Sequence, residues 1–127
     1  MKSKVKPTEL ELDILEVLWR EGPVTVRQIH EALQGRRPVV YTTILKAMQV
    51  MHEKGLLDRN EDARSHVYSP AIAKDDVSKG MMKNLLDRFF EGSAAQLAMH
   101  ALSTKPASQD EIRKVKVLLE EMEKKKK

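Results

Sequence analysis

The stretch that decides the fold lies at positions 41–55 and reads YTTILKAMQVMHEKG. When its residues are placed at 100° intervals, one side of the helix is apolar and collects Ile44, Ala47, Met48 and Met51. The opposite side is polar and collects Thr42, Lys46, Gln49 and Glu53. Gly55 follows as the expected left-handed residue that ends the helix. The stretch therefore predicts a helix over 41–54 with one buried and one exposed face.

A first helix is predicted upstream of this stretch. Thr8 and Glu11 have the spacing of a capping box, in which a hydroxyl and a carboxylate satisfy backbone N–H groups at the helix start. Its apolar side chains recur at helical spacing and comprise Leu10, Ile14, Val17 and Leu18. The pattern should stop near Gly22 and Pro23.

A second, shorter helix is expected over 26–33, between the first helix and the deciding stretch. Thr25 is its expected N-cap, Gln28 holds the box position, and the residues expected inside are Val26, Ile29 and Leu33. Gly35 is expected to end it. Arginines 36 and 37 then lie in the loop before the third helix.

Two short strands, 56–60 and 66–69, are predicted after the third helix, around a polar turn at 61–65, and Pro70 closes the hairpin. Three helices followed by a hairpin is the order of a winged helix-turn-helix. In that fold the third helix enters the DNA major groove and the hairpin contacts the backbone. Helical trios also occur in proteins that never meet DNA, so a winged-helix protein-protein interaction module is the alternative.

The remainder of the chain, 73–127, has a purely helical pattern. A helix through Val77 to Phe90, weakened by Gly80, is followed by one over 94–102 and by a last one that opens with the capping box Ser108 and Glu111. These helices carry apolar stripes that include Leu85, Leu86, Phe89, Phe90, Leu97, Ile112, Val115, Leu118, Leu119 and Met122.

Three short helices cannot bury such stripes well by themselves, so we expect them to form the interface of a homodimer. The alternative is that they pack on the N-terminal domain. The expected fold is mainly α with a small β-hairpin wing: a winged helix-turn-helix DNA-binding domain at 1–72 and a three-helix dimerisation domain at 73–127.

Composition narrows the classes of function. The 127 residues have a net charge of +4 and contain no Cys, which excludes disulfides and thiolate metal sites. No apolar run reaches the roughly 18 residues that a membrane span needs, and the N-terminus lacks the apolar core of a signal peptide. We therefore expect a cytoplasmic protein without direct membrane binding.

Enzyme motifs are incomplete in this sequence. His30-Glu31 and His52-Glu53 begin like the zinc-protease pattern H-E-x-x-H, but Gln34 and Leu56 stand where the second histidine belongs. No glycine-rich phosphate loop or nucleophile elbow is present. We expect no catalytic residue, no metal and no cofactor.

The expected site for double-stranded DNA lies on the third helix and around it. Its first turns place Tyr41, Thr42, Thr43 and Lys46 near the base edges. Contacts to the DNA backbone are expected from Gln28, Arg36, Arg37 and Arg64. For Lys46, a phosphate contact is commoner than a base contact. The Tyr41 ring could instead pack on the body of the fold. Any one of the arginines could instead be an ordinary solvated surface charge.

Several segments, taken in order, resemble one known family. They are ELELDIL at 9–15 through Trp19, GPVTVR at 22–27, YTTI at 41–44, KGLL at 54–57, the strand end YSP at 68–70, FFEG at 89–92 and SQDEI at 108–112. In order and spacing they resemble the penicillinase-repressor group, the BlaI/MecI/CopY family of bacterial transcriptional repressors.

The resemblance implies a sequence-specific DNA-binding repressor that acts as a homodimer on an inverted-repeat operator, often with TACA/TGTA half-site cores. It carries over Thr42, Thr43 and Lys46 as base-proximal residues and Arg64 as a wing contact. In antibiotic-responsive members a membrane sensor with a metalloprotease domain triggers cleavage at an Asn-Phe bond, so such a system is an implied upstream partner.

The sequence departs from the family pattern at three places. Alignment from the Ser108 motif puts His100-Ala101 where other members have the cleaved Asn-Phe bond. Val50 stands where many members have Arg. Copper-responsive members carry a C-terminal cysteine motif, which this chain lacks, so copper sensing of that kind is excluded.

Overall fold

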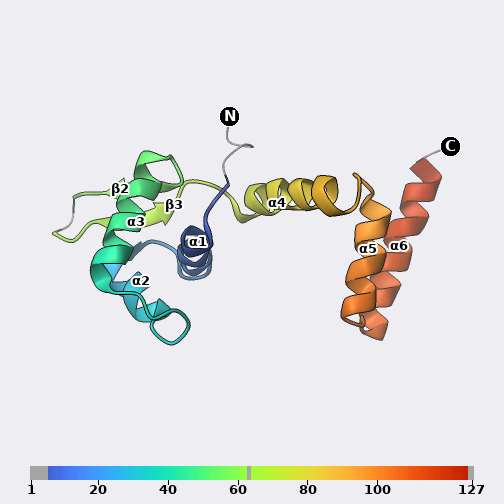
Figure 1. Ribbon diagram of the computed structural model, residues 1–127, viewed down its shortest axis with the longest axis horizontal. Helices are drawn as coiled ribbons and strands as arrows, with labels where there is room; N and C mark the ends of the chain where they lie inside the picture. The colour runs from blue at the N-terminus through green and yellow to red at the C-terminus, as the bar shows by residue number, and fades with distance from the viewer. Residues whose placement is uncertain (1–5, 63, 126–127) are drawn as a thin grey trace. The chain divides into compact units, whose positions relative to one another are not determined.

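A computed structural model describes residues 6–62 and 64–125 of the chain (Figure 1). Its contacts group into two compact units, Met1–Met82 and Lys83–Lys127, which divide within one helix. The first unit contains the three N-terminal helices and a small sheet, and the second contains helices alone.

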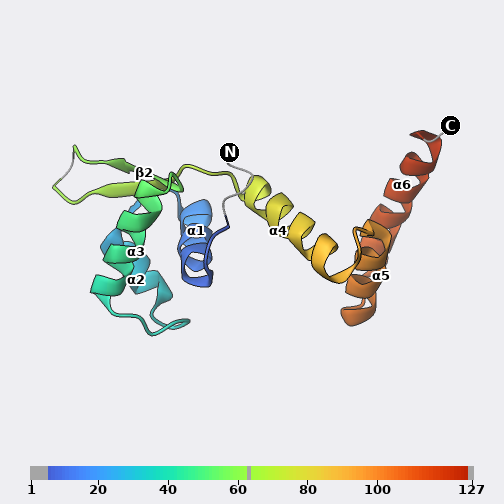
Figure 2. The same cartoon turned by 45° about the horizontal axis from the view of Figure 1, so that its top comes forward.

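The three N-terminal helices are α1 (Glu9–Glu21), α2 (Val26–Leu33) and α3 (Tyr41–Glu53). The sequence-based prediction of their starts is confirmed for α1 and α2, because both capping boxes form. The Thr8 hydroxyl accepts from the Glu11 amide at 3.1 Å, and the Glu11 carboxylate accepts from the Thr8 amide at 3.0 Å. Both views show α2 and α3 side by side, with α1 packed next to them (Figure 2).

The sheet has three antiparallel strands in the order β1-β3-β2: β1 (Val24–Thr25), β2 (Leu57–Asn60) and β3 (Val67–Pro70). The predicted hairpin of two strands forms, but the prediction missed the third strand, β1, which pairs with β3 through Val24 and Tyr68. The residue Pro70, expected to follow the hairpin, is the last residue of β3. Ala63, in the predicted turn, lies outside the described residues.

The core of the first unit forms where α1, α2, α3 and the sheet meet. Its buried apolar side chains are Ile14, Leu15, Val17, Leu18, Val24, Val26, Ile29, Leu33, Ile44, Met48, Met51, Leu56, Leu57, Tyr68, Ile72 and Val77. Leu15 is fully buried although the predicted stripe omitted it, whereas Leu10 is only half-buried. The Trp19 indole donates to the Ile72 carbonyl at 3.0 Å and so ties α1 to the segment after β3.

The second unit consists of the end of α4 (Lys74–Phe89) together with α5 (Ala94–Thr104) and α6 (Gln109–Lys125). Helix α4 continues through Gly80, and the capping box of Ser108 with Glu111 forms at the start of α6. Helices α5 and α6 run antiparallel beside each other (Figures 1 and 2). Within residues 6–62 and 64–125, every helix is too short or too polar to cross a bilayer.

Apolar side chains of the second unit are largely exposed. None of the described residues of α5 or α6 is buried, and Phe89 at the end of α4 is 71% exposed. On α6 the exposed apolar residues include Ile112, Leu118, Leu119 and Met122. A single chain therefore leaves the predicted stripes without a buried environment.

Candidate nucleic-acid interface

Helix α3 has one buried and one exposed face. Ile44, Met48 and Met51 have no exposed surface, which fixes the rotation of the helix on the core. The exposed positions on α3 include Thr42, Thr43, Lys46 and Gln49. The helical phase predicted from the sequence is confirmed, and it presents hydroxyl, ammonium and amide groups to solvent from one helix.

Tyr41, the first residue of α3, packs against α2 and also stays partly exposed. Its ring meets the His30 ring of α2 edge-on, with centroids 5.8 Å apart at 85°, yet 41% of the residue remains exposed. The ring thus packs against the neighbouring helix while part of the side chain stays accessible.

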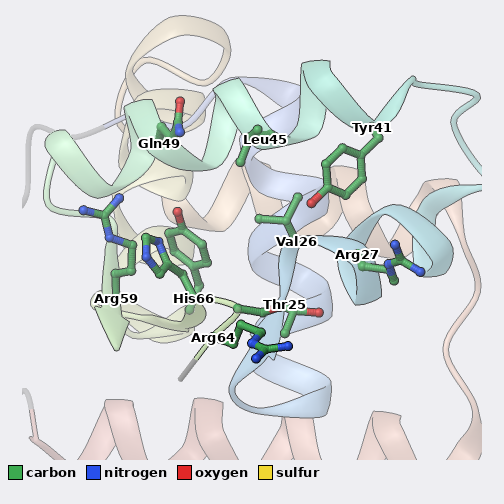
Figure 3. Close-up of a pocket in the computed structure, with 11 residues that line it drawn as sticks. Thr25, Val26, Arg27, Tyr41, Leu45, Gln49, Arg59, Arg64 and His66 are labelled. Carbon is green, nitrogen blue, oxygen red and sulfur yellow. The ribbon is translucent and has the colours of Figure 1, made fainter. Parts of the chain in front are cut away.

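A groove runs between α3 and the sheet, with the start of α2 on its third side (Figure 3). It has a volume of about 360 Å³ and is lined by Thr25, Val26, Arg27, Tyr41, Leu45, Gln49, Arg59, Arg64, Ser65, His66 and Tyr68. Figure 3 shows Tyr41 and Gln49 on the α3 side and Arg59 and His66 on the sheet side. The groove therefore joins the exposed face of α3 to the wing.

The lining of this groove is basic. It includes the guanidinium groups of Arg27, Arg59 and Arg64 and the imidazole of His66, and no carboxylate belongs to the described residues that line it. Positive groups that converge on a concave surface raise the local concentration of anions. Such a surface suits a polyanion better than a neutral or cationic ligand.

One arginine of the groove is paired with a carboxylate just outside it. Arg59 donates from Nε to Oε2 of Glu61 at 2.7 Å, and its Nη2 lies 2.6 Å from the same oxygen. Interactions with the Tyr68 hydroxyl and then with Glu61 raise the pKa of Arg59. Hydrogen bonding from Arg59 lowers the pKa of Glu61, so this carboxyl group stays ionised to a lower pH than an ordinary glutamate does.

The two arginines of the loop before α3 face acidic residues of α1. Arg37 Nε lies 2.7 Å from Asp13 Oδ2, and Arg36 Nη1 lies 3.0 Å from Glu16 Oε1. Arg36 also approaches Asp13 at 3.6 Å. Both guanidinium groups keep part of their surface in water, and each already has an anionic partner within the chain.

Two further residues have local roles that bear on the predicted site. Lys54 at the end of α3 pairs with the buried Glu11 at 2.9 Å. Gln28 accepts from the Thr25 amide at 2.9 Å and so completes the α2 capping box. The basic residues around the third helix are thus partly the counterparts of the acidic residues of α1, and Gln28 serves its own helix start.

Sequence reasoning missed three residues that line the groove, namely Arg27, Arg59 and His66. Alternation along β2 was a usable signal for Arg59, because it places Arg59 on the same face as the buried Leu57. His66 is the first residue of the predicted strand 66–69 and directly precedes β3, and Arg27 lies in the first turn of α2. Neither carries a local pattern that separates it from an ordinary surface residue.

Three helices, a three-stranded sheet with an extended hairpin, and an exposed polar face on the third helix define a winged helix-turn-helix protein. Residues 7–121 match the family described as penicillinase repressor. The transcriptional regulator BlaI of Mycobacterium tuberculosis is 36% identical over 92 residues, which are 72% of this chain and 67% of that protein.

Two proteins connected with Bacillus licheniformis extend the comparison. The penicillinase repressor of that organism is 24% identical over 127 residues, which are 100% of this chain and 99% of the relative. A solved structure of its BlaI, a monomeric form in complex with the blaP half-operator, has a TM-score of 0.50 and 22% identity. That match covers 57% of this chain and 88% of the solved one, and it confirms the fold.

The chain belongs to the penicillinase repressor family, a family of transcriptional repressors.

Proposed function

We propose that this chain represses transcription by binding an inverted-repeat operator in double-stranded DNA as a homodimer. The observation that carries the proposal is the pair of faces on α3, because the face opposite its buried side chains is polar and exposed. A helix of this width fits the major groove of B-form DNA. Family membership supports the same function, since a relative of the same fold was solved with a half-operator.

The first turns of α3 supply the groups that read bases. Thr42 and Thr43 are exposed, and a threonine can donate or accept a hydrogen bond and place its methyl against that of thymine. Lys46 lies one turn further along the same face, where its ammonium reaches either guanine or a phosphate. Tyr41 reads a neighbouring position through the part of its side chain that His30 leaves exposed.

Contacts to the DNA backbone come from both edges of the groove. Arg64 on the wing and Arg27 at the start of α2 are exposed, and both line the groove. Arg36, Arg37 and Gln28 contribute less in this proposal, because each already has an intramolecular partner. An arginine has five N–H donors, so a paired one retains the capacity to meet a phosphate.

The homodimer forms through the second unit, from 83 onward. Support comes from the apolar residues that one chain leaves exposed on α4, α5 and α6, among them Phe89, Leu118 and Leu119. A two-fold axis gives both copies the same surface and orients two winged domains toward the two halves of an inverted repeat. Two linked modules also bind far more tightly than one.

The DNA proposal is tested by fluorescence anisotropy with the labelled DNA upstream of the gene for this chain and with a scrambled duplex of equal length. We expect nanomolar affinity for the upstream DNA and a steep loss of affinity with salt. Thr42→Ala and Lys46→Ala should each weaken upstream binding about tenfold while circular dichroism stays unchanged, because both side chains point away from the core.

Lys124→Ala is the matched control for Lys46→Ala, since it removes the same charge from an exposed position on α6. It should change the preference for the upstream DNA over the scrambled duplex by less than about twofold. Binding that is absent at micromolar protein, or insensitive to salt, contradicts the proposal and favours a protein-interaction module instead.

We also propose that a membrane sensor-protease acts upstream of this chain and releases repression. The chain itself works in the cytoplasm, where an operator-binding repressor finds its DNA. His100 and Ala101, at the position of the cleaved bond, are exposed within the helix α5. Immunoblotting of cells treated with a β-lactam tests this partner. A shortened chain supports it, and a full-length chain in derepressed cells contradicts it.

A further inference from the structure

Arg59 lines the basic groove between α3 and the wing (Figure 3), and it is paired with Glu61. Most of the Arg59 side chain is buried, with 23% exposed, and its guanidinium lines the groove. Glu61 is 53% exposed and does not line the groove. A cation with a fixed position therefore faces the groove, and its counterion stands outside it.

The contacts of Arg59 leave part of its guanidinium available. The carboxylate of Glu61 takes up the edge formed by Nε and Nη2, through a single oxygen. A guanidinium has five N–H donors, and the bonds to Glu61 and the interaction with the Tyr68 hydroxyl leave others that can meet a phosphate. Glu61 therefore need not leave for an anion to bind, but its charge opposes any anion that approaches.

The neighbours of Arg59 indicate which anion fits. Arg27, Arg64 and His66 line the same groove, and the groove continues onto the exposed face of α3 through Tyr41 and Gln49. A series of cations beside a polar helix face suits the repeated phosphates of a nucleic-acid strand. A single small anion would use only one of these groups.

We propose that Arg59 is a phosphate ligand of the DNA interface and that Glu61 partly neutralises it, so that Glu61 weakens binding to every DNA sequence by a similar factor. The proposal rests on the proposed function and deepens it. A phosphate contact carries no base information, so the pair sets the strength of binding to all DNA and leaves the preference for the operator unchanged. For a repressor this limits the fraction of protein held on unrelated chromosomal DNA.

Glu61→Gln tests the proposal in the full-length chain. It keeps the shape of the side chain and removes the charge beside Arg59. We expect affinity for the upstream duplex and for the scrambled duplex to rise together by about threefold to tenfold at low salt, because a like charge is removed a few ångströms from a bound phosphate. The gain should shrink as salt is added.

Asp58→Asn is the matched control. Asp58 is one position before Arg59 on β2, is exposed, and by strand alternation projects to the other side of the sheet. It removes the same charge from the same strand without touching the Arg59 pair. Its effect on affinity for either duplex should stay below about twofold.

Arg59→Gln completes a double-mutant cycle. Alone, Arg59→Gln should weaken binding to both duplexes by a similar factor. It should also make the plot of log affinity against log salt less steep, by the amount that about one phosphate contact contributes. In the Arg59→Gln background, Glu61→Gln should change affinity no more than Asp58→Asn does, because the cation that Glu61 neutralises is gone. Circular dichroism checks that each variant folds.

The outcomes separate this inference from the proposed function. A wild-type chain that binds neither duplex overturns both. A wild-type chain that binds the upstream duplex, with Glu61→Gln equal to Asp58→Asn or weaker than wild type, overturns the inference alone, and weaker binding would show that Glu61 positions Arg59. A gain limited to the upstream duplex also overturns it, because Arg59 would then read sequence.

Discussion

The unit Met1–Met82 has a closed apolar core, whereas the unit Lys83–Lys127 leaves its apolar side chains exposed. Helices α3 and α6 can be compared directly, because both are amphipathic. On the apolar face of α3, Ile44, Met48 and Met51 are fully buried, while Leu118 and Leu119 on α6 are 55% and 54% exposed. The same kind of pattern is therefore buried in the core of one unit and leaves an exposed apolar surface on the other.

This contrast separates two demands on the sequence. The winged unit holds a rigid helix toward DNA and needs its own core to do so. In the proposed homodimer the second unit buries its stripes on association, so we expect its stability to depend on protein concentration.

Leu118→Asp combined with Leu119→Asp should give the largest effect. Two carboxylates in a buried apolar interface are strongly unfavourable, so the variant should be a monomer by sedimentation. It should lose at least about 100-fold in affinity for an inverted-repeat operator, since the second half-site no longer binds as part of the same complex. Lys124→Asp, on the opposite side of α6, is the control, and a dimeric double variant would refute the interface.

Ile44→Ala and Leu119→Ala compare one apolar residue from each unit. Ile44 has no exposed surface, so its truncation should lower the free energy of unfolding of the winged unit by about 2–5 kcal/mol. Leu119→Ala should leave that transition unchanged and instead weaken dimerisation. Urea unfolding followed by circular dichroism, at several protein concentrations, measures both. Equal effects of the two variants on the winged unit would contradict the division.

Fragments that end at 72 and at 82 test where the winged domain stops. We predict a domain boundary between 72 and 73 from the sequence, but Val77 of α4 is buried in the core cluster. The fragment 1–82 should unfold cooperatively, and the fragment 1–72 should be less stable by about 1–3 kcal/mol because it lacks that side chain. Equal melting temperatures would support the boundary at 72.

Asp13→Asn should have the smallest of these effects. Its carboxylate lies 2.7 Å from Arg37 and has little exposed surface, so the loss of the pair should cost about 1–2 kcal/mol of unfolding free energy. Glu16→Gln breaks only the exposed pair with Arg36 and should cost less than about 1 kcal/mol. Thermal unfolding ranks them, and an equal or reversed order would show that burial does not strengthen the Asp13 pair.

Local signals in the sequence predicted much of the fold. Capping boxes mark the starts of α1, α2 and α6 because both partners lie within one helical turn, and their hydrogen bonds form. The buried and exposed faces of α3 follow from its period alone. Positive φ at Gly55, 86°, matches the expected end of α3.

Features that depend on distant partners escaped prediction. Strand β1 has two residues, too few for an alternating pattern, and it exists because Val24 meets Tyr68. Arg37 lies 24 positions from Asp13, so a charged loop had the same sequence signature whether it faced DNA or α1. The groove was missed for the same reason, since it gathers residues from α2, α3 and the sheet.

The most direct test of the account is a hydroxyl-radical footprint of the wild-type chain and of Thr42→Ala on the DNA upstream of its gene. The account predicts two protected segments related by a dyad, about one helical turn or a multiple of it apart, from two protomers per site. With Thr42→Ala at the same concentration, protection should fade in both segments together. A single unpaired segment, or protection that survives the substitution in full, would contradict the claim that a dimer reads the operator through α3.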